Sequence, residues 1–124
     1  MPKVMLIEDD KTMIDLLTTL LEIEGYEVAS FMGGTDVIPF IQRENPDVIL
    51  LDINLDNLGS QMTNGFDLLA AIRRDQDLCH ISVIVSSGMN YLEESKAAGA
   101  AGFVMKPYMP DDLLDMIRTN ITIN

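Results

Sequence analysis

The stretch Val48-Ile49-Leu50-Leu51-Asp52 decides the fold, because four consecutive apolar residues lead directly into an acid. Apolar residues at successive positions, instead of alternate ones, indicate a strand that is buried on both faces of a parallel sheet. Four further runs of this kind occur, at Val4 to Ile7, Tyr26 to Phe31, Val83 to Val85 and Gly102 to Met105. The sequence therefore predicts five buried strands.

The segments between these runs have helical periodicity. Apolar residues recur at three- and four-residue spacing from Lys11 to Glu24, and Gly25 is placed to end that helix. Four more helices are predicted: Thr35 (as cap) to about Asn45, Phe66 to Arg73, Asn90 with Glu93 at its start to about Gly99, and one beginning at Pro110. Strand and helix alternate five times, which predicts an α/β fold, a doubly wound five-stranded parallel sheet with helices on both faces.

Length and charge limit the function. The 124 residues suit one domain, 1–124, and 20 acidic against 8 basic residues give a net charge of −12. This balance argues against binding of nucleic acid or an anionic membrane and favours a cation or a basic protein surface. The single Cys79 excludes an internal disulfide, and no signal segment or bilayer-length apolar run is present, so a cytoplasmic location is expected.

Polar residues gather where the predicted strands end, and ligands bind at that edge of such sheets. They are Glu8, Asp9, Asp10, Asp52, Ser86, Ser87, Lys106 and Pro107. Carboxylates that converge raise one another's pKa unless a cation neutralises them, and Mg²⁺ prefers such oxygen ligands. A carboxylate beside Mg²⁺, a lysine and a hydroxyl suits phosphoryl transfer that forms an acyl phosphate.

Four motifs together resemble those of bacterial response-regulator receiver domains of the chemotaxis-regulator type, over nearly the whole chain. They are Ile7 to Asp10, Leu50 to Leu55, Val85 to Gly88 and Phe103 to Pro107. The resemblance implies the flavodoxin-like strand order 2-1-3-4-5.

The resemblance also implies roles for individual residues. Asp52 would be the phosphoacceptor, with Ser87 and Lys106 contacting phosphoryl oxygens. Mg²⁺, or Mn²⁺ as a substitute, would be held by Asp9 directly, by Glu8 through water, by Asp52 and by the backbone carbonyl of Asn54. Phe103 would be the switch aromatic, and the Lys106–Pro107 peptide bond would be cis.

The function implied is a phosphorelay switch and not a turnover enzyme. A histidine kinase or histidine phosphotransfer protein would phosphorylate Asp52, which would then slowly lose the group, and the switched surface would contact a downstream target or effector domain. Helix four, strand five and helix five form a candidate dimer face. One rival is a phosphohydrolase of the haloacid-dehalogenase kind, which needs a second acid where Asn54 stands. The other is a non-phosphorylated scaffold that keeps the fold, and its mark would be loss of Asp52, Lys106 or the acidic pair, all of which are present.

Several residues have simpler interpretations. Asp10 could be only a helix cap, Ser86 an ordinary strand residue, Phe103 a core residue and His80 a surface residue.

The chain also departs from the family: Gly65, expected to open helix three, follows Asp52 by thirteen residues, about five more than usual. We hypothesise that the polar loop 56–64 alters access to the phosphoryl group. Met89 is apolar, which leaves Asn54 as the polar residue able to orient water.

Overall fold

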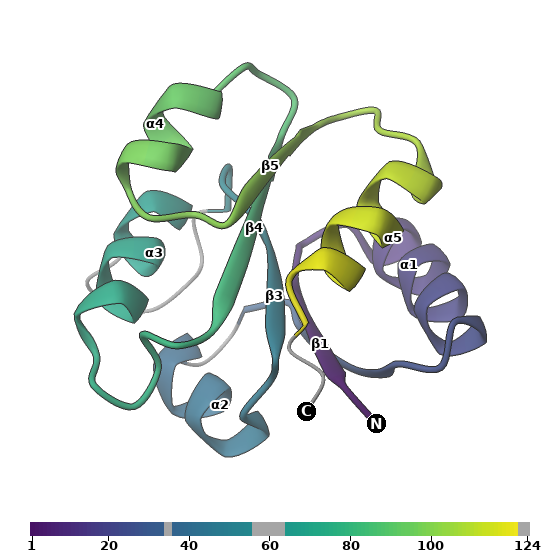
Figure 1. Ribbon diagram of the computed structural model, residues 1–124, viewed down its shortest axis with the longest axis horizontal. Helices are drawn as coiled ribbons and strands as arrows, with labels where there is room; N and C mark the ends of the chain where they lie inside the picture. The colour runs from purple at the N-terminus through teal and green to yellow at the C-terminus, as the bar shows by residue number, and fades with distance from the viewer. Residues whose placement is uncertain (34–35, 56–63, 122–124) are drawn as a thin grey trace.

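The computed structural model describes residues 1–33, 36–55 and 64–121, and Figure 1 shows their arrangement. Strands and helices alternate strictly, as the sequence predicts. In chain order they are β1 (Lys3–Ile7), α1 (Lys11–Ile23), β2 (Glu27–Phe31), α2 (Val37–Glu44), β3 (Val48–Asp52), α3 (Gly65–Arg74), β4 (Ser82–Ser87), α4 (Leu92–Ala97), β5 (Gly102–Met105) and α5 (Pro110–Thr119).

The five strands form one parallel sheet in the order β2-β1-β3-β4-β5. The predicted order is therefore confirmed. In the register of the central strands, Ile7 lies opposite Leu51, and Leu51 lies opposite Val85. All strands consequently end at the same edge of the sheet, and the residues that follow them meet there.

Helices cover both faces of the sheet: α1 and α5 lie on one face, and α2, α3 and α4 lie on the other (Figure 1). Successive residues of β1 divide between the two layers, since Val4 packs with α1 and α5 while Met5 packs with α2 and α3. This division is why the strands are continuously apolar. Each such aliphatic side chain contributes about 1.5–3 kcal/mol through its burial.

Helix boundaries differ from the predictions at two places. Helix α2 begins at Val37 after Asp36, with Pro39 in its first turn, and the predicted cap Thr35 lies outside the described residues. Helix α4 begins at Leu92 and not at Asn90, so the capping-box prediction is wrong. Asn90 instead accepts a hydrogen bond from the Leu92 backbone N–H at 3.2 Å, as Asn does in tight turns.

Other helix ends follow the predictions. Gly25 and Gly99 both have a left-handed backbone, with φ of 92° and 93°, and each follows the C-cap residue of its helix, α1 or α4. Glycine adopts this conformation without a steric penalty. Pro110 begins α5. None of the helices in the described ranges is long and apolar enough to cross a membrane.

Candidate functional site

Three carboxylates meet at the carboxyl edge of the sheet. Glu8 and Asp9 follow β1, and Asp52 ends the neighbouring strand β3. One carboxylate oxygen from each residue lies within 4.8 Å of the others. Glu8 and Asp52 are 5% and 6% exposed, whereas Asp9 is exposed to solvent. The convergence predicted from the strand ends is therefore present.

Lys106 is the positive charge of this cluster. Its Nζ donates hydrogen bonds to Glu8 Oε2 and Asp52 Oδ2, both at 3.1 Å. Burial alone would lower the pKa of Lys106, but its bonds to these two carboxylates outweigh burial and raise the pKa above the ordinary value. The Lys106 backbone N–H is fixed by Ser87 O at 2.7 Å, and the Lys106–Pro107 peptide bond is cis, as the resemblance implied. Lys106 is therefore held charged between two strands.

Glu8 is a buried carboxyl whose pKa lies above its ordinary value. Burial raises its pKa, the hydrogen bond from Lys106 partly opposes this, and the charge of Asp52 adds to the increase. Its Oε1 also accepts the backbone N–H groups of Asp9 and Asp10, at 3.2 and 3.3 Å. One lysine faces three acids, so the cluster retains an excess of negative charge in the absence of a cation.

Ser87 brings a hydroxyl from the end of β4 and is completely buried. Its Oγ accepts hydrogen bonds from Asn54 Nδ2 at 3.2 Å and from the Met89 backbone N–H at 3.1 Å. The Asn54 backbone N–H donates to Asp52 Oδ1 at 3.0 Å. Asn54 thus touches both the carboxylate of β3 and the hydroxyl of β4.

The donor set of the acidic cluster fits a hard divalent cation. Mg²⁺ and Mn²⁺ favour carboxylate and carbonyl oxygens, and Mg²⁺ keeps several waters when it binds. Two carboxylates here are buried and preorganised, while Asp9 is open to solvent, which leaves room for those waters. An excess of carboxylates over lysine supplies the electrostatic reason to bind a cation.

The remaining sequence candidates separate into site and structural roles. Asp10 lies outside the acidic cluster and caps α1, accepting a hydrogen bond from the Met13 backbone N–H at 3.2 Å. Phe103 is half-buried and packs against the core on the α2–α3–α4 face. Ser86 is a buried residue of β4, and His80 is exposed, as expected.

The loop that follows Asp52 enters α3 at Gly65, as the sequence predicts. Asn64 caps this helix by accepting the backbone N–H groups of Phe66 and Asp67. Residues 56–63 of the predicted solvated segment 56–64 lie outside the described residues. Its suggested influence on access to the site therefore stays a prediction.

Two features of the site were missed from the sequence. Tyr108 lies two residues after Lys106, and burial raises the pKa of its hydroxyl to about 12. Because Tyr108 directly follows Lys106–Pro107, the sequence could have indicated that Tyr108 lies near the site. The second feature is the bond between the Asn54 side chain and Ser87, which no local pattern predicts because 33 residues separate the partners.

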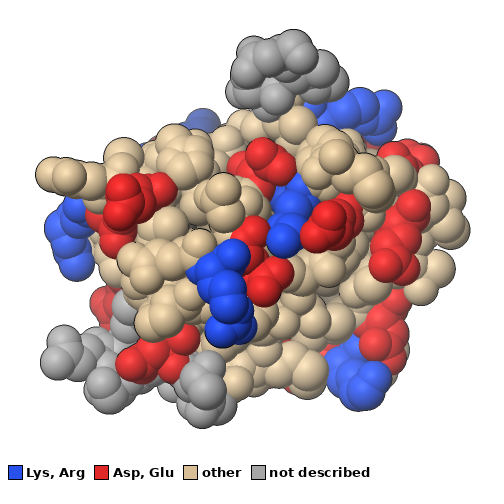
Figure 2. Space-filling model, turned by 90° about the horizontal axis from the view of Figure 1, so that it is seen from below, with Lys and Arg blue, Asp and Glu red and all other residues tan. Residues whose placement is uncertain are grey.

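Charges elsewhere on the surface are arranged differently. At the amino ends of the strands, Lys3 Nζ pairs with Glu27 at 3.2 Å and Glu44 at 3.3 Å. Figure 2 views the molecule from below Figure 1 and shows acidic and basic side chains interspersed over this opposite face. Among the described residues, only Glu8, Asp9 and Asp52 form a group of three or more acidic, His or Cys side chains close enough to share a metal ion.

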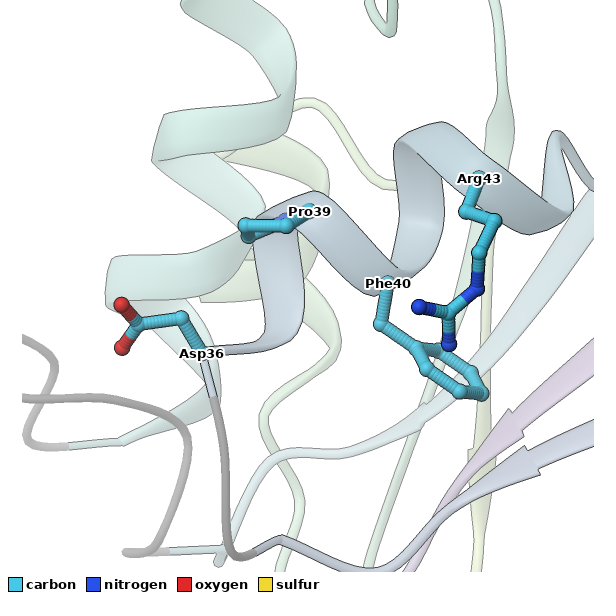
Figure 3. A pocket seen from close by; sticks show the side chains of 4 residues that line it. All are labelled: Asp36, Pro39, Phe40 and Arg43. Carbon is cyan, nitrogen blue, oxygen red and sulfur yellow. The ribbon is translucent and has the colours of Figure 1, made fainter.

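A hollow of about 380 Å³ lies on α2, and no residue of the acidic cluster lines it. It is lined by Asp36, Pro39, Phe40 and Arg43 (Figure 3). The Arg43 guanidinium lies 5.0 Å from the centre of the Phe40 ring. The Asp36 carboxylate points away from Arg43 (Figure 3). This hollow contains none of the predicted site residues.

Comparison with known proteins agrees with the fold. Residues 4–118 match the family model described as response regulator receiver domain, so the chain belongs to the receiver domain family of two-component systems. Receiver domains are signalling switches that pair with histidine kinases and effector domains, and they bind Mg²⁺ at an acidic pocket.

Curated relatives of this chain include longer regulatory proteins. The DNA-binding response regulator MtrA of Mycolicibacterium paratuberculosis is 25% identical over 98% of this chain and 52% of that protein. The regulatory protein VanRc of Enterococcus gallinarum is 29% identical over 96% of this chain and 49% of its own length. The chain thus spans about half the length of these curated relatives.

The fold is shared with solved receiver structures. The chemotaxis response regulator CheY4 of Vibrio cholerae superposes with a TM-score of 0.82 at 27% identity, covering 98% of this chain and 99% of that one. A CheY-like receiver domain protein from Methanospirillum hungatei is 30% identical with a TM-score of 0.76, covering 96% and 92% of the two chains.

Proposed function

We propose that residues 1–124 act as one receiver domain that takes a phosphoryl group on Asp52 from a phosphohistidine. The observation that carries the proposal is the placement of Asp52, nearly buried between Lys106 and two further acids at the edge where the strands end. Membership of the receiver family supports the reaction class. The donor would be a histidine kinase or a histidine phosphotransfer protein.

The reaction proposed is a transfer between two nucleophiles. A carboxylate oxygen of Asp52 forms a bond to phosphorus while the bond from phosphorus to the donor's imidazole nitrogen breaks. The imidazole leaves with the electron pair and takes a proton from solvent. The Lys106 ammonium, held 3.1 Å from Asp52, is placed to stabilise negative charge on the phosphoryl oxygens.

Glu8, Asp9, Asp52 and the backbone carbonyl of Asn54 would hold Mg²⁺, or Mn²⁺ in its place. A bound cation supplies neutralisation of the acids and of the phosphoryl charge. Glu8 and Asp9 would keep the cation beside Asp52, and the exposure of Asp9 leaves the site open to the donor. Water that enters the same opening accounts for slow loss of the phosphoryl group.

Signalling requires that phosphorylation favours one conformation over another. Ser87 and Lys106 would contact phosphoryl oxygens in the favoured state, and Phe103 would change its packing when Ser87 moves. A switch from about 1% to 99% needs about 5.5 kcal/mol of differential stabilisation. Two charge-assisted hydrogen bonds and the cation can supply an amount of this order.

The switched surface would act through protein contact with a downstream target or effector domain, with α4, β5 and α5 as the candidate dimer face. DNA binding is stated in the name of MtrA, of which this chain matches about half. The net charge of −12 supports a receiver that does not itself bind nucleic acid or membranes. Cytoplasmic placement fits a partner kinase that uses ATP.

The test is incubation with a small phosphodonor and Mg²⁺, followed by measurement of the intact mass. The wild-type protein should gain one phosphoryl group, and Asp52→Asn should gain none. Asp10→Asn is the matched control, because Asp10 caps α1 outside the cluster, and it should be phosphorylated like the wild type. Phosphorylation that survives Asp52→Asn would disprove the proposal.

A further inference from the structure

The Ser87 hydroxyl accepts hydrogen bonds from two neighbouring N–H groups. A serine hydroxyl offers two acceptor lone pairs and one donor hydrogen. Here the Asn54 amide and the Met89 backbone N–H both donate to Ser87 Oγ, at 3.2 and 3.1 Å. Both lone pairs are therefore used, and only the hydroxyl hydrogen is left.

The hydrogen of Ser87 has no protein acceptor in the part of the chain that the structure describes. Ser87 is completely buried, so solvent does not readily take the place of that acceptor. A buried donor without a partner is unfavourable and gains more than an exposed one when an acceptor arrives. An anionic oxygen attached to Asp52 would be such an acceptor.

Asn54 is the residue that connects the two groups. Its backbone N–H fixes Asp52 Oδ1 at 3.0 Å, and its side-chain amide donates to the Ser87 hydroxyl. We propose that Asn54 is a positioning residue for phosphoryl transfer: its amide N–H orients Ser87 so that the hydroxyl donates toward the phosphoryl group. This inference rests on the proposed function of Asp52.

The proposal depends on the direction of one hydrogen bond. An amide can donate to Ser87, whereas a carboxylate at the same position can only accept. In Asn54→Asp the Ser87 hydroxyl would turn to donate to the new carboxylate and would no longer be available to a phosphoryl oxygen. In Asn54→Ala the hydroxyl keeps its donor hydrogen but loses one of the two contacts that orient it.

The experiment measures initial rates of phosphorylation by acetyl phosphate in excess with Mg²⁺, so that loss of the phosphoryl group does not enter. We expect Asn54→Ala to be slower by about threefold to tenfold, and Asn54→Asp to be slower still, near the rate of Ser87→Ala. Thermal unfolding of each variant checks that the fold is kept.

A double-mutant cycle isolates the positioning role. If Asn54 acts through the hydroxyl, Asn54→Ala should change the rate by less than twofold in the Ser87→Ala background. In the Ser86→Ala background, which removes the neighbouring hydroxyl, the full effect of Asn54→Ala should remain. Equal effects of Asn54→Ala in all three backgrounds would overturn the proposal.

A spectroscopic measurement tests the orientation without the reaction. The Met89 amide donates to the same Ser87 oxygen, so its proton chemical shift reports on the hydroxyl. Asn54→Asp should move this resonance in the metal-free, unphosphorylated protein, and an unmoved resonance would contradict the proposal. If the wild type is not phosphorylated at all, the function proposed for Asp52 fails, and the Met89 resonance still decides whether Asn54 orients Ser87.

Discussion

Replacing Gly65 by alanine tests how closely α3 must approach the site. Gly65 is the first residue of α3, and its backbone N–H donates to Ile53 O at 3.0 Å. A Cβ added there would lie 2.7 Å from Ile53 Cα, 3.0 Å from Ile53 Cδ1 and 3.2 Å from Asp52 O. Two of these atoms are backbone and cannot rotate away, so α3 or the chain leaving β3 must shift.

The cost follows from two opposing contributions. Overpacking of a close contact costs typically about 1–3 kcal/mol. Alanine also restricts the unfolded chain, which returns about 0.4–1 kcal/mol. We therefore expect Gly65→Ala to lower the free energy of unfolding by about 1–2 kcal/mol. For a chain of this length, that corresponds to a fall in Tm of roughly 4–8 °C.

The assay is urea unfolding and thermal unfolding of metal-free protein, with Gly88→Ala as the matched control. No atom lies within 4 Å of a Cβ built at Gly88, so this variant should be as stable as the wild type or slightly more stable. A Gly65→Ala protein that is no less stable than Gly88→Ala would refute the reasoning.

Three further predictions concern single contacts. Burial raises the pKa of Glu8, so folding favours its protonated form; the wild type then gains stability as pH falls through that raised pKa and loses it as pH rises. Glu8→Gln should therefore have a larger free energy of unfolding than the wild type at pH 7 without metal, and this difference should shrink toward acid in urea unfolding. A difference that grows toward acid would contradict the prediction. The variant should also bind Mg²⁺ more weakly in a calorimetric titration. Asn64→Ala removes the cap of α3 and should cost about 1 kcal/mol in urea unfolding, whereas Asn64→Asp should cost much less; equal losses would exclude capping as the cause. Arg73 donates to the carbonyls of Ile81 and Gly99, so Arg73→Met should cost about 1–3 kcal/mol in thermal unfolding, and an unchanged Tm would show that these bonds contribute nothing.

Much of the fold follows from local pattern. The runs around Val4 and Val48 are apolar at every position because both faces of the sheet are covered, and this predicted the parallel α/β architecture. Because the carboxyl ends of parallel strands share one edge of the sheet, the sequence also predicted that Glu8, Asp52 and Lys106 lie together. Helix ends with a specific chemical cause, such as Asp10 and Gly25, were also predictable.

What could not be predicted depends on contacts between distant segments. Asn90 suits a helix cap by composition, yet its side chain closes a turn, so α4 begins two residues later. The Asn54–Ser87 hydrogen bond depends on how β3 and β4 align, and the raised pKa of Tyr108 depends on its burial. A one-dimensional pattern contains neither of these three-dimensional relations.

The central claim is that Asp52 carries the phosphoryl group, and chemical mapping of the acyl phosphate tests it most directly. Protein treated with acetyl phosphate and Mg²⁺ is reduced with borohydride, which converts a phosphorylated aspartate to homoserine, and is then sequenced by tandem mass spectrometry. Homoserine at position 52, absent without phosphodonor or without Mg²⁺, is the predicted result. Homoserine at position 9 or 10, or formed equally in the absence of Mg²⁺, would contradict the claim.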